Sequence, residues 1–134
     1  VKCMSFLIQK KKLKKGSSLV FTSSISSSFP YKGGAVYTSS KAALETYSKV
    51  LAIELAADGI RSNCIKAGLV ATKILEETKA NMPDEVFDNH VAQYPLGIGE
   101  TIDVAKAVGF LLSDDSKWIT GTEIVLDGGL TAGA

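Results

Sequence analysis

The chain has 134 residues, of which 46% are hydrophobic and 22% charged, and its formal net charge is +1. This length suits one ordinary domain, and the composition is sufficient for a buried core. No apolar run approaches the about 20 residues that a transmembrane helix needs. The first apolar stretch, residues 4–8, precedes a group of lysines, whereas a secretory signal carries its charges first. We therefore expect a cytoplasmic protein without a membrane partner.

The cysteine and histidine content argues against several kinds of site. Cys3 and Cys64 lie far apart in the sequence and suit neither a disulfide framework nor a zinc site. His90 stands alone among polar residues, so we interpret it as a surface residue rather than a ligand or a catalytic base. No metal site is expected.

The positive charge is concentrated in residues 1–15, which carry six lysines and no acid. Such a run can bind nucleic acid, which would show as steeply salt-dependent binding. We favour a different interpretation, because no aromatic residue lies among the lysines of residues 10–15. Residues 3–14 are expected to end a helix whose C-terminal dipole the lysines complement, with Gly16 as the stop. No nucleic-acid partner is expected.

The next segments predict a strand, a loop and a long helix. Residues 18–23 form a short apolar, β-branched run between turn residues, which is typical of a buried strand. Residues 24–35 are rich in serine and glycine and predict a loop. Residues 36–57 contain no glycine or proline and predict a helix. Its expected apolar stripe comprises Leu44, Tyr47, Leu51 and Leu55, and a second face on which side chains can pair comprises Lys41, Glu45 and Lys49.

The rest of the chain alternates between the same two kinds of element. We expect strands over residues 60–66 and 123–126, one or two short helices over residues 72–94 with a break at Pro83, and a helix over residues 102–112. Strands that alternate with helices indicate an α/β fold with a parallel sheet and helices on its faces. The chain is expected to be one domain or one part of a larger domain.

Tyr37 and Lys41 are candidates for proton chemistry. Four residues apart on a helix, they share a face. A free tyrosine has a pKa of about 10, and a nearby cation favours its phenolate form. The pair by itself also arises by chance on exposed helix faces. Ser23 and Ser24, however, end a predicted strand at the carboxyl edge, where open parallel sheets bind ligands. A hydroxyl there can hydrogen-bond a substrate carbonyl while the tyrosine protonates it.

Four segments together resemble the short-chain dehydrogenase/reductase family: GSSLVFTSS (16–24), YTSSKAAL (37–44), NCIKAGLVAT (63–72) and WITGTEIVLDGG (118–129). They keep the family's order and spacing over nearly the whole chain. The resemblance implies that residues 1–134 are the C-terminal catalytic part of a Rossmann-like, doubly wound parallel sheet, with about three strands. It also implies an oxidoreductase that uses NAD or NADP to interconvert a carbonyl and a secondary alcohol, similar to 3-oxoacyl reductases or related enzymes.

The resemblance assigns roles in catalysis to three residues. Tyr37 would be the acid and base. Lys41 would favour the phenolate and hold the nicotinamide ribose. Ser24 would position the reacting carbonyl, with Ser23 as the alternative for that role. The family's assembly implies a homodimer or homotetramer that packs through the helix carrying Tyr37.

The resemblance also assigns a cofactor loop that contains Gly68, Val70 and Thr72. Backbone groups of Val70 would meet the nicotinamide carboxamide, and Thr72 would contact the cofactor amide or phosphate. Residues 73–96 would form a mobile substrate lid. The family usually has Pro-Gly where this chain has Ala67 and Gly68, so we expect a looser loop.

One departure from the family concerns the cofactor's phosphates. These residues contain no G-x-G-x-x-G turn, and the residue that selects between NAD and NADP normally follows that turn. We therefore expect this chain to be an incomplete copy of its parent protein, in which the strand containing Val20 has an unpaired edge. By itself the chain is expected to bind the cofactor poorly and to have little turnover. A non-enzymatic remnant of the same fold is the alternative. Sugar epimerases and dehydratases share Tyr-x-x-x-Lys but are longer after it, and the mixed lid composition leaves the substrate open.

Overall fold

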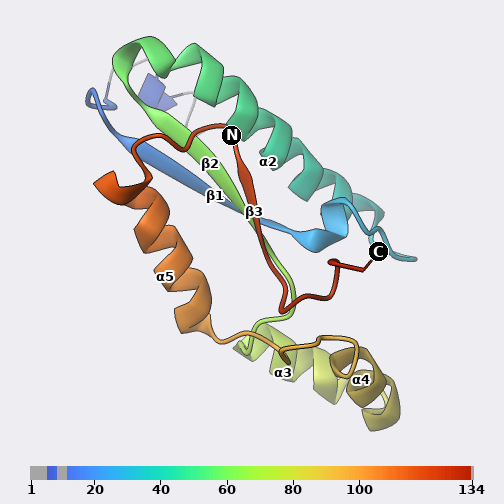
Figure 1. The fold of residues 1–134 in the computed structure, drawn as a ribbon. Helices are drawn as coiled ribbons and strands as arrows, with labels where there is room; N and C mark the ends of the chain where they lie inside the picture. The colour runs from blue at the N-terminus through green and yellow to red at the C-terminus, as the bar shows by residue number, and fades with distance from the viewer. Residues whose placement is uncertain (1–5, 9–11, 134) are drawn as a thin grey trace.

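The computed structural model describes residues 6–8 and 12–133. Its centre is a parallel sheet with the strand order β1-β2-β3. The strands are β1 (Ser18–Ser24), β2 (Arg61–Ala67) and β3 (Glu123–Leu126), each within one residue of its predicted bounds. Helices α2 (Ala35–Glu54) and α5 (Thr101–Leu112) lie on opposite sides of the sheet (Figure 1). This is the expected α/β arrangement.

The helices agree with the sequence pattern in position and differ at their ends. Helix α2 stops at Glu54, and the predicted extension to residue 57 continues as a 3₁₀ turn, η2 (Ala56–Asp58). The region expected to hold one or two helices holds two, α3 (Lys73–Ala80) and α4 (Asp84–Val91), which lie together at one end of the sheet (Figure 1). Two further 3₁₀ turns are η1 (Ile25–Ser27) and η3 (Asp114–Ser116).

The expected helix over residues 3–14 falls partly outside the described residues. Residues 6–8 are helical, but residues 12–17 are not. The predicted extension of the helix to residue 14 is therefore wrong, although the Lys12 amide donates to the Leu7 carbonyl over 2.9 Å. The chain turns here to enter β1, because the amide of Gly16 donates to the carbonyl of Asp58 over 3.1 Å. Cys3 lies outside the described residues.

Alternation along the strands divides the core between the two helices. The hydroxyl of Ser62 lies 3.0 Å from that of Ser48 on α2, so Ser62 and Cys64 face α2. Ile65 and Leu111 are fully buried on the α5 side. The predicted apolar stripe of α2 is confirmed at its centre, since Leu51 is 1% exposed. Within the described ranges, no helix combines the length and the hydropathy needed to cross a membrane.

The side chains of the second predicted face of α2 pair with the sheet rather than with one another. Glu45 is buried, and its carboxylate pairs with Lys66 of β2 rather than with a lysine of its own helix. Lys49 pairs with Glu123 of β3, and Lys41 donates to a backbone carbonyl of β1. The expected pairing within this face is therefore wrong, because the three side chains reach the sheet, where they find partners from other elements.

Arg61 fixes the C-terminal end of α5 to the sheet. Its guanidinium donates to the carbonyl oxygens of Leu111 (2.8 Å) and Ser113 (2.9 Å) and to the hydroxyl of Ser116 (3.0 Å). The last carbonyls of a helix have no partner within the helix, and a cation there also complements the helix dipole. The start of β2 and the end of α5 are thereby held together.

Candidate functional site

Ser24 lies at the carboxyl end of β1 and begins η1. Its Oγ accepts hydrogen bonds from the amide of Ser26 (3.3 Å) and from the hydroxyl of Ser26 (3.0 Å). Its carbonyl accepts from the hydroxyl of Ser27 (2.7 Å). The side chain therefore caps a short turn at the sheet edge where parallel sheets bind ligands. It is partly exposed.

Ser23 points the other way, into the interface with α2. It is 3% exposed, and its hydroxyl donates to Oε1 of Glu45 over 2.6 Å and lies 3.1 Å from the carbonyl oxygen of Lys41. Ser23 and Ser24, the two candidates for positioning the reacting carbonyl, thus have different surroundings. The Ser23 hydroxyl joins β1 to α2, and the Ser24 hydroxyl is the one nearer to solvent.

Tyr37 and Lys41 share a face at the start of α2. The Lys41 ammonium lies 5.5 Å from the centroid of the Tyr37 ring, within the range of a cation–π contact. The same Nζ donates to the carbonyl oxygen of Thr22 over 3.0 Å, which ties the lysine to the end of β1. Tyr37 is 46% exposed, so its phenol is accessible. The structure therefore brings Tyr37 and Lys41 together beside the strand that ends in Ser24.

The loop after β2 contains the other predicted residues. Val70 and Gly99 form an isolated parallel bridge, in which the Ala71 amide donates to Gly99 (2.8 Å) and the Gly99 amide donates to Leu69 (3.0 Å). Gly68 approaches its neighbours so closely that a Cβ there would lie 3.0 Å from atoms of both Asp127 and Tyr94. The loop is therefore restrained on both sides of Val70.

Tyr94 supports this loop and was missed by the sequence reasoning. Its phenol oxygen accepts a hydrogen bond from the Leu69 amide over 3.2 Å, and the residue is 5% exposed. Burial raises the pKa of Tyr94, an effect that the Leu69 N–H partly opposes and the charge of Asp127 adds to. No local pattern around residue 94 distinguishes it, because its role depends on a segment 25 residues earlier.

Asp127 holds the turn that packs on Gly68. Its carboxylate accepts from the Gly129 amide (3.0 Å) and from the Thr131 amide (2.9 Å) and hydroxyl (2.6 Å). Burial by itself would raise the pKa of Asp127, but the hydrogen bonds from Thr131 and Gly129 outweigh it, so the pKa is lowered. The sequence marked Asp-Gly-Gly as a family segment without showing this contact with the loop.

Comparison with known proteins decides the family. A family model described as enoyl-(acyl carrier protein) reductase matches residues 1–131. The 2,5-dichloro-2,5-cyclohexadiene-1,4-diol dehydrogenase of Sphingobium indicum is 38% identical over 117 residues, which are 87% of this chain and 45% of that protein. The chain belongs to the short-chain dehydrogenase/reductase family.

Other members of the short-chain dehydrogenase/reductase family give the same result. The (3R)-3-hydroxyacyl-CoA dehydrogenase of Mus musculus is 39% identical over 114 residues, which are 84% of this chain and 42% of that protein. A structure of 4-hydroxyisoleucine dehydrogenase complexed with NADH superimposes with a TM-score of 0.81 at 31% identity, covering 89% of this chain and 49% of that one. The chain thus spans about half the length of the curated relatives it matches.

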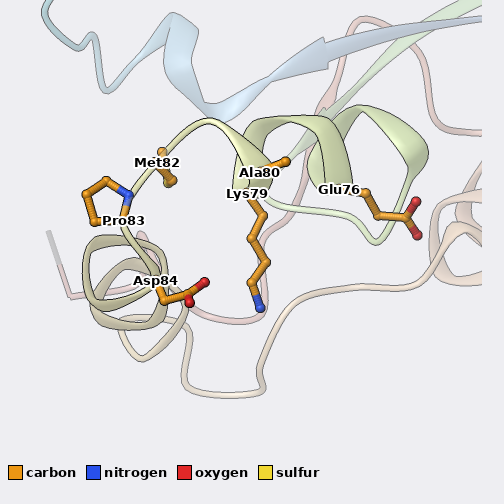
Figure 2. Close-up of a pocket in the computed structure, with 6 residues that line it drawn as sticks. All are labelled: Glu76, Lys79, Ala80, Met82, Pro83 and Asp84. Carbon is orange, nitrogen blue, oxygen red and sulfur yellow. The ribbon is translucent and has the colours of Figure 1, made fainter.

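In this short-chain dehydrogenase/reductase chain, Thr72 caps a helix of the predicted lid. Its Oγ1 accepts from the Leu75 amide over 3.4 Å at the start of α3. An open hollow of about 530 Å³ lies between α3 and α4, and Figure 2 shows Lys79 and Asp84 pointing into the same gap between these helices. The lining residues are Glu76, Lys79, Ala80, Met82, Pro83 and Asp84. None of the predicted catalytic residues contributes to this hollow.

The remaining predictions concern His90 and metals. His90 is exposed, as predicted, and its ring contacts that of Tyr94 edge to face at 5.8 Å between centroids. Across residues 6–8 and 12–133, no three His, Cys, Asp or Glu side chains are grouped as metal ligands.

Proposed function

We propose that Ser24, Tyr37 and Lys41 are the catalytic residues of an NAD(P)-dependent oxidoreductase that interconverts a carbonyl and a secondary alcohol. The observation that carries the proposal is the placement of Lys41. Its ammonium lies 5.5 Å from the Tyr37 ring centroid and is anchored by Thr22 at the end of β1. A cation is thereby held next to an exposed phenol at the ligand-binding edge of a parallel sheet.

The residues present suit a nicotinamide cofactor. A lysine has three N–H donors, and Lys41 uses one of them on Thr22, which leaves donors for ribose hydroxyls. In the described part of the chain, no hydrogen bond involves the amide or carbonyl of Val70, whose neighbours pair with Gly99. These two groups are suited to the nicotinamide carboxamide. Gly68 packs against Asp127 and Tyr94 and so holds the backbone of this loop in place.

The chemistry follows from these positions. A bound nicotinamide supplies or accepts the hydride. Tyr37 donates a proton to the carbonyl oxygen during reduction and takes it back during oxidation. The charge of Lys41 stabilises the negative charge that develops on the phenol oxygen, and the Ser24 hydroxyl hydrogen-bonds the reacting oxygen of the substrate.

The finer points of the proposal are the substrate, cofactor, assembly and location. We propose a 3-oxoacyl compound or a related small carbonyl, in line with the hydroxyacyl-CoA dehydrogenase among the relatives. The cofactor is NAD or NADP, and a related dehydrogenase has been seen with NADH. A homodimer or homotetramer in the cytoplasm completes the proposal. Assembly through α2 is supported by two exposed apolar side chains, Val36 (86% exposed) and Ile53 (79%).

A chimera tests the function directly. Residues 1–134 would replace the matching half of the Sphingobium diol dehydrogenase, which brings its own first half, and turnover with NAD and NADP would be followed on secondary alcohols and ketones. We expect Tyr37→Phe to lower kcat about 100-fold or more. Tyr47→Phe is the matched control, because it removes the same hydroxyl from a tyrosine of the same helix that packs on Phe21.

Two outcomes would contradict the proposal. A folded chimera that binds NADH but keeps its full turnover after Tyr37→Phe would exclude the assigned acid and base. A folded chimera without any turnover would favour the second candidate, a non-enzymatic remnant of the fold. Isothermal titration of the 134-residue chain alone with NADH and NADPH is expected to show weak binding, and micromolar affinity would overturn that expectation.

A further inference from the structure

A group of buried charges lies behind the proposed site and has no part in the chemistry described above. Lys66, in the central strand β2, is 6% exposed, although lysine is almost never fully buried unless it is paired. Its Nζ has three hydrogen-bond partners: Oγ of Ser28 at 2.6 Å, Oε2 of Glu45 at 3.2 Å and Oε2 of Glu123 at 3.4 Å. Three donors thus meet three acceptors from three different elements of the structure.

One of these bonds anchors the turn that follows Ser24. Ser28 is exposed, and its amide donates to Ile25 over 3.0 Å to close η1, the turn that Ser24 caps. The other hydrogen bonds of residues 25–33 in the described part of the chain are local or lead toward α2. Three of these local bonds reach Ser24 at the end of β1, and the bond from Lys66 to Ser28 ties the segment to the central strand β2.

The other branch reaches the second half of the proposed site. Glu45, held by Lys66, accepts the Ser23 hydroxyl over 2.6 Å through its other oxygen. The Ser23 hydroxyl also lies 3.1 Å from the carbonyl oxygen of Lys41. One buried ammonium is therefore connected to residues on both sides of Ser24 and to the backbone of Lys41.

Stability alone does not explain this arrangement. Apolar side chains of similar volume often replace a buried ion pair without loss of stability, so burial of charge is a weak stabilising device. An ammonium with three partners, by contrast, fixes the direction of each one. Lys49 pairs with the other oxygen of Glu123, so the two lysines are matched by the two carboxylates.

We propose that Lys66 is a positioning residue of this enzyme, which orients Ser24 and Lys41 through its bonds to Ser28 and Glu45. This inference rests on the proposed function, because it assigns a purpose to Lys66 only if Ser24 and Lys41 act on a substrate. It extends that function by placing a control point of the site in β2, where Lys66 is the register partner of Ser23.

Ser28→Ala is the most selective variant. It removes one hydrogen bond of Lys66 and leaves both lysines and both glutamates of the group paired. Lys66→Met is the second variant, and it leaves the buried Glu45 carboxylate without a cation, while Glu123 keeps Lys49. Ser28→Thr keeps the hydroxyl and is expected to behave as wild type. Ser17→Ala is the matched control, because its hydroxyl, at the other end of the sheet next to β1, makes no hydrogen bond within the described ranges.

The first readout is amide hydrogen exchange, which does not depend on activity. In the 134-residue chain, we expect Ser28→Ala to accelerate exchange over residues 25–33 about tenfold while α5 and β3 stay protected. The second readout is turnover in the chimera. Small misplacements at an active site cost rate, so Ser28→Ala should lower kcat about tenfold with KM unchanged, and Ser28→Thr should restore it.

The outcomes separate the two proposals. Unchanged exchange and unchanged kcat in Ser28→Ala would overturn the positioning role, even if Tyr37→Phe is inactive. Faster exchange with unchanged kcat would also overturn it, because Lys66 would then be structural only. If the wild-type chimera itself has no turnover, the proposed function fails and the positioning role fails with it, whatever the exchange shows.

Discussion

Replacement of Gly68 by alanine tests the close packing beneath the loop that follows β2. The added Cβ would lie 3.0 Å from Cα and Cβ of Asp127 and 3.0 Å from a ring carbon of Tyr94. Carbon atoms in ordinary contact are about 3.5–4.0 Å apart, so the neighbours must move by about half an ångström or more. The carboxylate of Asp127 is held by hydrogen bonds from Gly129 and Thr131, so this side cannot yield easily.

We therefore expect Gly68→Ala to lower the free energy of unfolding by about 1–3 kcal/mol, the usual cost of overpacking. Denaturant titration of the 134-residue chain, followed by circular dichroism, measures it. Gly109→Ala is the matched control, because a Cβ there meets nothing within 4 Å. In the middle of α5, that change should stabilise the chain by about 0.5–1 kcal/mol. Equal shifts of the same sign for both variants would refute the packing argument.

Three other predictions concern charges and the buried thiol. Arg61→Met should lower the free energy of unfolding by about 2 kcal/mol, because it removes the charged hydrogen bonds that tie the end of α5 to β2; a loss below the error of denaturant titration would contradict this. The hydrogen bond and charge of Lys49 lower the pKa of Glu123 below 4.5. The ion pair of Glu123 and Lys49 therefore contributes stability at a pH above the ordinary pKa of a glutamate, and this stability is lost as the pH falls through the lowered pKa of Glu123. Glu123→Gln should flatten this part of the profile of unfolding free energy against pH. Burial, followed by the two nearby carboxylates, raises the pKa of Cys64 to about 11, so in a Cys3→Ser background this thiol should react with a thiol reagent only after unfolding.

The order and type of the elements could be predicted because each depends on a few consecutive residues. Three local patterns show this: the apolar run of β1, the glycine-free stretch of α2 and the break at Pro83. The structure has a strand at the first and a helix at the second, and the third separates α3 from α4. The pair Tyr37 and Lys41 was found for the same reason, since helix geometry alone puts residues four apart on one face. The expected helix over residues 3–14 shows the limit of local patterns, because residues 12–14 are not helical and already lead into β1.

The tertiary structure alone decided which polar groups meet. Glu45 shows this: its spacing from Lys41 and Lys49 predicted pairing within one face of the helix, yet it is buried against Lys66. That contact requires the register of β1 against β2, which pairs Ser23 with Lys66, and the rotation of α2 over both strands. Tyr94 reaches the loop after β2 in the same way, through folding of a distant segment. Composition and spacing determine which elements form and which family the chain resembles, whereas register and packing determine which side chains hold the site in place.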